Sequence, residues 1–130
     1  MAKTLAIVFG IVFVLVGVLG FIPNGIVGAM GIFETNTLHD LVHLLVGIIL
    51  LAVAFTAPMK SALWLKILGA VYLVLAVLGF LMIPSGGMLL GLVQMNATDH
   101  LLHAVLGIVL IAAGAMGGGS KPAMMPGSAM

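Results

Sequence analysis

The residues of this chain that could do chemistry lie in two short stretches about sixty positions apart. They include all four histidines and two of the three acidic residues of the sequence: His39, Asp40, His43, Asp99, His100 and His103. Imidazole and carboxylate groups bind transition metals, and histidine exchanges protons near neutral pH. Both groups can also hydrogen-bond between helices. These six residues are therefore the candidate metal ligands, and the rest of the chain must position them.

The composition shows what kind of protein carries these residues. Of its 130 residues, 64% are hydrophobic and only 5% are charged. A soluble domain has roughly 25% charged residues, so a lipid bilayer must be the solvent of this chain. Four apolar stretches are long enough to cross it, at residues 5–22, 38–55, 62–83 and 98–116. The sequence thus predicts an all-α integral membrane four-helix bundle.

Prolines and glycines divide the chain into segments. Pro23, Pro58 and Pro84 each follow an apolar stretch, as helix-breaking residues commonly do. We expect one membrane domain at residues 1–117, followed by a flexible cytoplasmic tail rich in Gly, Pro and Met at 118–130. The apolar segments 26–34 and 88–95 are too short to span. We expect them to lie in the interface or to fold back over the histidines.

The membrane domain contains an internal repeat, with residues 5–56 as the first copy and 62–116 as the second. At an offset of sixty, Asn36, His43 and Gly47 meet identical residues at Asn96, His103 and Gly107. Each copy has two helices, so both copies have the same orientation in the membrane. This predicts two parallel two-helix repeats related by a pseudo-two-fold axis along the membrane normal.

The lysines predict the orientation of the bundle. Lys3, Lys60, Lys66 and Lys121 all fall on one side of a four-span chain, and the connections on the other side have no Lys or Arg. The positive-inside rule then places both termini in the cytoplasm and the His/Asp cluster on the outer side. The net charge of +1 also argues against nucleic acid as a partner.

Three stretches carry a family resemblance: "GIFETNTLHDLVHLLVGIILL", "VYLVLAVLGF" and "GLVQMNATDHLLHAVLGIVL". They resemble the four-helix bacterial membrane proteins of the DUF4383 family, over about Gly10 to Met116. The resemblance implies the same fold and a place in the cytoplasmic (inner) membrane of a prokaryote. It implies no activity, because the family name records an uncharacterised domain.

The two polar stretches stand where the second and fourth helices begin. Asn36 or Thr37 can cap the second helix, and Asn96 can cap the fourth. Asp40 and Asp99 follow in the first turn, where a carboxylate can complete a capping box and interact with the helix dipole. These aspartates are therefore expected to be structural.

The histidines lie deeper than the caps. His43 and His103 each follow the capping Asn by seven residues, which places them roughly 10 Å inward along the helix axis. An ionisable side chain at that depth should face the bundle interior. If the inward stripes of the two helices face each other, Asp40 meets His100 and His43 meets His103.

Three hypotheses follow for this cluster. The first is an interhelical hydrogen-bond zipper, which we favour. The second is ligation, either of a haem or other tetrapyrrole by His43 and His103, or of a metal ion by the six candidate ligands. Gly47 and Gly107 would then leave space for a flat ring. The third is a proton or ion relay, disfavoured because no ionisable group continues below the glycines.

Copper handling is a further hypothesis, because the chain has ten methionines. Thioethers bind Cu(I), but methionine is also ordinary packing material. No two methionines have the spacing of three or four typical of a copper motif, so packing is preferred for Met30, Met88, Met95, Met124, Met125 and Met130.

These observations give the predicted function. We expect a small non-catalytic membrane protein, a structural or accessory component of a larger membrane complex or a homo-oligomer, surrounded by membrane lipid. No nucleophile and base can be paired, so no enzyme is expected. The alternative is a haem- or metal-binding protein with His43 and His103 as ligands. An ion- or proton-conducting oligomer comes third.

Overall fold

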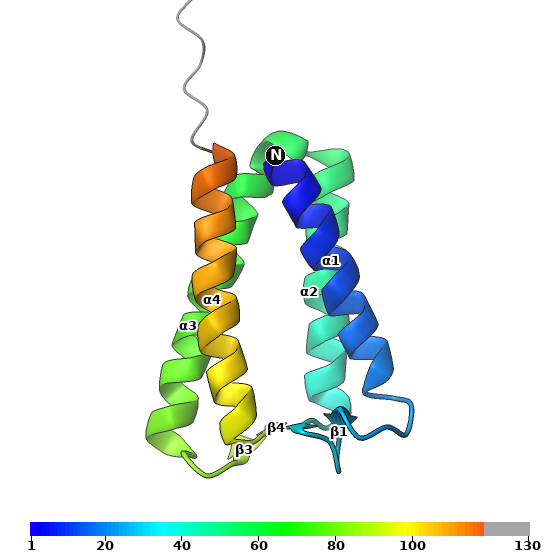
Figure 1. Cartoon of the computed structure of the whole chain (residues 1–130), viewed down its shortest axis with the longest axis vertical. Coiled ribbons are helices and arrows are strands. Elements are labelled where there is room, and N and C mark those ends of the chain that lie inside the picture. Colours follow the sequence, from blue (N-terminus) through cyan, green and yellow to red (C-terminus); the bar gives the residue numbers. More distant parts are fainter. Residues whose placement is uncertain (119–130) are drawn as a thin grey trace, which may run out of the picture.

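The computed structural model describes residues 1–118, which form a bundle of four long helices (Figure 1). The helices are Ala2–Leu19 (α1), Thr37–Thr56 (α2), Ser61–Met82 (α3) and Ala97–Gly118 (α4), with a short 3-10 helix at Pro58–Lys60 (η1). All four are long and apolar enough to cross a membrane. The predicted four-helix membrane bundle is confirmed, and the chain is a multi-pass membrane protein. The predicted tail, beyond Gly118, lies outside the described residues.

The helices associate as two hairpins, α1 with α2 and α3 with α4 (Figure 1). In each hairpin two glycines face each other. A Cβ added to Gly47 would lie 2.7 Å from the Gly10 carbonyl oxygen, and one added to Gly107 would lie 2.8 Å from the Gly69 carbonyl oxygen. Lipid gives helices no hydrophobic reason to associate, so this close backbone approach supplies dispersion contacts instead.

A common core joins the two hairpins. The rings of Phe13 and Tyr72 pack with their centroids 5.3 Å apart, and Leu50, Leu65 and Leu110 are fully buried near them. Large aliphatic side chains on the opposite helix faces, such as Leu15 and Leu45, remain exposed. Apolar residues thus cover both the inside and the outside of the bundle, as a lipid environment requires.

The first helix ends three residues earlier than residue 22, the predicted end. The side chain of Asn24 explains the difference. Its Nδ2 donates to the carbonyl oxygens of Leu19 and Val27, at 2.8 and 2.9 Å. Its Oδ1 accepts from the backbone amides of Ile26 and Val27, both at 2.8 Å. The chain tightens to bonds between residues three apart at Phe21 and Ile22, and the Asn24 side chain then holds the start of the loop.

Short strands occupy the two connections at the end opposite the N-terminus (Figure 1). Val27–Gly28 (β1) pairs in parallel with Phe33–Glu34 (β2), and Gly87–Leu89 (β3) pairs antiparallel with Val93–Met95 (β4). The β3–β4 turn needs positive φ at Leu90 and Gly91, 54° and 72°, which costs little only at the glycine. The strands themselves were not predicted, because runs of two or three residues carry no readable alternation.

The two connections touch each other through equivalent residues. Asn36 Nδ2 donates to the Leu92 carbonyl oxygen at 3.0 Å, and Asn96 Nδ2 donates to the Ile32 carbonyl oxygen at 2.8 Å. The two asparagines lie sixty positions apart in the sequence, and so do the two residues whose carbonyl oxygens accept. Each bond is therefore the counterpart of the other at the offset of the internal repeat. The connections are thereby fastened across the end of the bundle that holds the histidines.

Candidate metal centre

The capping residues fix where the polar side chains begin. Asn36 Oδ1 accepts from the backbone amide of His39, and Asn96 Oδ1 accepts from that of Asp99, both at 3.0 Å. Asparagine therefore caps both helices, and Thr37 is the first residue inside α2. In α4 the box is reciprocal, because Asp99 Oδ2 accepts from the Asn96 amide at 3.0 Å. In α2 the matching position is held by His39, so Asp40 does not complete the expected box.

The His39 side chain does not take part in the cap and instead turns toward the β3–β4 connection in the other half of the molecule. Its side chain is 2% exposed, and its Nδ1 lies 2.6 Å from the carbonyl oxygen of Gln94 in β4. A carbonyl oxygen only accepts, so Nδ1 must carry the proton. The lone pair then lies on Nε2, which is buried and has no hydrogen-bond partner in the described part of the chain. A backbone carbonyl commonly orients a metal-binding histidine in this way.

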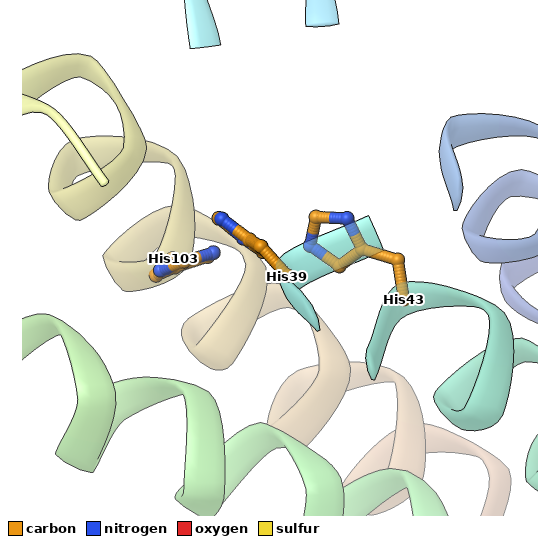
Figure 2. Close-up of side chains that lie close together, drawn as sticks. All are labelled: His39, His43 and His103. Atoms are coloured by element: carbon orange, nitrogen blue, oxygen red, sulfur yellow. The ribbon is translucent and has the colours of Figure 1, made fainter. Parts of the chain in front are cut away.

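His43 and His103 complete a cluster with His39 (Figure 2). The His39 and His43 rings have centroids 4.5 Å apart, and the His103 ring lies 5.7 Å from His39 and 6.3 Å from His43. One nitrogen from each ring can be chosen so that all three lie within 4.8 Å of one another. Nδ1 of His43 and both nitrogens of His103 also lack hydrogen-bond partners among residues 1–118.

The remaining candidate ligands lie elsewhere. The Asp40 carboxyl packs against the backbone of Gly20, and the His100 ring packs against Gly79. His100 Nε2 lies 2.8 Å from the Ile83 carbonyl oxygen. The predicted meeting of Asp40 with His100 is therefore wrong. Each of these side chains turns back into its own hairpin, where a glycine on the neighbouring helix leaves room for it.

The expected space for a flat ring is also absent at the two glycines. A Cβ on Gly47 would lie within 3 Å of Val14, and one on Gly107 within 3 Å of Leu73. Helices α1 and α3 therefore fill the sites where a tetrapyrrole was expected. Within the described residues, no hydrogen bond joins a histidine to another histidine or to an aspartate side chain. The histidine hydrogen bonds there go to backbone carbonyl oxygens of neighbouring elements, those of Gln94 and Ile83.

Two cavities adjoin the cluster. The first, called here the histidine cavity, has a volume of about 170 Å³ and is lined by His39, His43, His103, Tyr72, Met95 and aliphatic side chains. The second, called the aspartate cavity, has a volume of about 130 Å³ and is lined by Asp99, Thr35, His43 and apolar side chains. His43 lines both cavities and so stands between them.

The histidine cavity contains two further side chains that the sequence did not assign to the His/Asp cluster. Tyr72 is 2% exposed, its hydroxyl has no partner in the described chain, and its ring lies 5.2 Å from that of His103. Met95 is equally buried. A signal existed for Tyr72: it is the only tyrosine of the chain and stands at the repeat position of Phe13. Met95 was one of six methionines considered for copper, but the lack of a methionine motif favoured packing instead.

The geometry suits one small cation. Imidazole nitrogens bind zinc at roughly 2.0–2.1 Å, which sets three of them about 3.4 Å apart around one ion. Nitrogens within 4.8 Å can reach that spacing by small side-chain rotations. Each of the three imidazoles also has a buried nitrogen without a hydrogen-bond partner in the described residues, and a buried polar atom is costly unless a ligand or hydrogen bond satisfies it.

Comparison with known proteins identifies the family. Residues 3–116 match the domain of unknown function DUF4383, and the chain therefore belongs to that family. The predicted resemblance is confirmed. No curated protein and no solved structure matches the chain.

Proposed function

We propose that this DUF4383 membrane protein binds a transition-metal ion through His39, His43 and His103. The observation that carries the proposal is the convergence of three buried imidazoles, each with at least one buried nitrogen that has no hydrogen-bond partner among residues 1–118. Bundle cores commonly hold metal sites built from facing helices. Two helices contribute here: α2 supplies two ligands one turn apart, and α4 supplies the third.

The histidine cavity supports this function further. It adjoins all three imidazoles and leaves one side of the cluster free of protein atoms. A metal bound by three protein ligands can take a fourth from water, from a substrate or from a nearby side chain. Structural metal sites usually close all four positions with protein atoms. The site would therefore be open to chemistry or exchange unless a neighbouring side chain closes it.

Orientation and setting form part of the same proposal. Lys3, Lys60 and Lys66 lie at or near the end of the bundle where α2 turns into α3. Under the positive-inside rule this end faces the cytoplasm, and the metal site lies near the outer face of a prokaryotic inner membrane. The accessory function in a larger complex stays a prediction. The exposed apolar helix faces suit lipid as well as a neighbouring subunit.

The test is metal content and metal titration of the protein purified in a mild detergent. The chain offers a closely matched pair of variants, His103→Gln and His100→Gln. Both residues lie on α4, both are buried at 1% and 0% exposure, and both lose an imidazole. We expect about one ion per wild-type chain, a loss of at least about tenfold in affinity for His103→Gln, and wild-type binding for His100→Gln.

Two results would contradict the metal centre. A wild-type protein that binds no divalent or monovalent transition metal after titration would rule it out. Equal binding by His103→Gln and His100→Gln would show that the metal attaches elsewhere. Thermal unfolding of both variants in the same detergent checks that each is folded.

A further inference from the structure

Met95 brings a thioether to the cavity that the three histidines line. In β4 successive side chains point to opposite faces. The side chain of Gln94 donates to Glu34 Oε2 at 3.1 Å, on one face. Met95 lies on the other face, is 2% exposed and lines the histidine cavity together with all three imidazoles. The same strand thus orients His39 through the Gln94 carbonyl and brings a sulfur to the cavity that His39 lines.

The cavity also contains no negative charge. Its lining consists of imidazoles, one phenol, one thioether and aliphatic side chains, with no carboxylate. The cost of transferring an ion from water into a low-dielectric interior grows with the square of its charge. A ligand set of neutral groups therefore favours a monovalent cation over a divalent one. Among metals that imidazole binds, copper in its reduced state meets this condition.

We propose that the ion is Cu(I), bound by His39, His43 and His103 with the sulfur of Met95 as a fourth ligand. The inference rests on the proposed metal centre and specifies its occupant. Soft thioether ligands select Cu(I). Zinc, in contrast, takes thiolate, imidazole and carboxylate ligands, and a thioether adds little to a zinc site.

The equivalent position in the other half supports the assignment. Thr35 stands sixty residues before Met95, is 3% exposed and lines the aspartate cavity with Asp99. His43 lines both cavities and Tyr72 adds a phenol to the histidine cavity, but two pairs of equivalent positions differ: Met95 faces the histidine cavity where Thr35 faces the aspartate cavity, and His39 does so where Asp99 does. A packing function alone would not require a sulfur donor at one of these equivalent positions and an oxygen donor at the other.

The experiment is anaerobic titration of the full chain in detergent, with Cu(I) against a chromophoric Cu(I) chelator and separately with Zn(II). X-ray absorption of the copper-loaded wild type then reports the ligands. We expect a sulfur neighbour at about 2.3 Å, the usual metal–sulfur length. Met95→Leu keeps the volume of the side chain and should weaken Cu(I) binding about tenfold or more while leaving Zn(II) binding unchanged. Met88→Leu, at the 45% exposed methionine of the same hairpin, is the matched control.

The outcomes distinguish the Cu(I) assignment from the three-histidine metal centre on which it rests. Two results would overturn the copper assignment and leave the three-histidine centre standing. One is an X-ray absorption spectrum in which copper has only nitrogen neighbours. The other is tighter binding of Zn(II) than of Cu(I), with metal affinities that Met95→Leu does not change. A chain that binds neither metal would overturn both. Because the absorption spectrum is taken on the wild type, a Met95→Leu protein that fails to fold does not leave the proposal undecided.

Discussion

The histidine cavity and the aspartate cavity are built from equivalent positions, yet they hold different donors. His39 lines one where Asp99 lines the other, and Met95 stands in one where Thr35 stands in the other. The helices of each hairpin approach through a glycine pair at equivalent positions, Gly10 with Gly47 and Gly69 with Gly107. The backbone frame around the two cavities is thus alike, while the exchange of a few side chains gives only one cavity three imidazoles and a thioether.

The largest effect on stability is expected at the glycine contacts, which the two halves have in common. Gly47→Leu would force a side chain against the Gly10 carbonyl oxygen and the Val14 amide, which cannot move without separating α1 from α2. We expect a loss of more than about 3 kcal/mol in unfolding free energy, the upper end for overpacking. Gly107→Leu should act alike in the second hairpin. Thermal unfolding in detergent measures both.

The control for these variants is Gly25→Ala, because nothing lies within 4 Å of a Cβ at Gly25. It should leave the melting temperature within error of the wild type. If Gly47→Leu unfolded at the temperature of Gly25→Ala, the close helix contact would not be what holds the hairpin together.

The next largest effect comes from making the two cavities alike. His39→Asp gives the histidine cavity the residue of its counterpart. One of three imidazoles is lost, and we expect the Cu(I) affinity to fall by at least about a hundredfold, the upper end for a lost supporting contact at a metal site. Chelator competition measures the change. An affinity unchanged within error would mean that His39 is not a ligand.

Asp99→Ala tests the aspartate cavity and should show a smaller effect, on stability and not on metal affinity. Asp99 accepts from the Asn96 amide at the start of α4, so its loss should cost about 1 kcal/mol of stability. Metal affinity should stay unchanged. Calorimetry and the same titration separate the two quantities. A fall in metal affinity comparable to that of His39→Asp would place Asp99 in the metal site.

The smallest effect is expected for Tyr72→Phe, which gives the second half the ring of Phe13. The buried hydroxyl has no partner in the described chain, so its removal should leave stability unchanged or raise it by up to about 1 kcal/mol. Thermal unfolding of the metal-free protein measures this. A clear destabilisation would show that the hydroxyl makes a bond in solution.

The sequence predicted the spans and the approach of His43 to His103, but not which neighbours join them. His39 and Asp40 each lie close to the direction of His43, since residues four and three apart differ by about 40° and 60° around a helix. A small rotation of α2 decides which of the two faces the bundle centre. That rotation depends on how α2 packs against its neighbouring helices, which composition and spacing alone do not determine.

Other parts of the site depend on contacts far apart in the sequence. The partner of His39 is the carbonyl oxygen of Gln94, a backbone atom that any residue type could supply. Met95 reaches the cavity because β3 and β4 pair in one register, with Met88 opposite Gln94. Neither feature leaves a mark in the local pattern, which explains why the sequence indicated six ligands and the structure gathers three.

The stability of the β3–β4 hairpin would affect how long an ion stays bound at the histidine cluster. The hairpin forms one wall of the histidine cavity and supplies both the carbonyl that orients His39 and the sulfur of Met95. An isolated two-stranded hairpin is marginally stable, and such segments open locally far more often than a whole domain unfolds. The residence time of an ion at this centre would then follow the opening rate of a few residues, so loading and release could be fast in a bundle whose helices stay firmly packed.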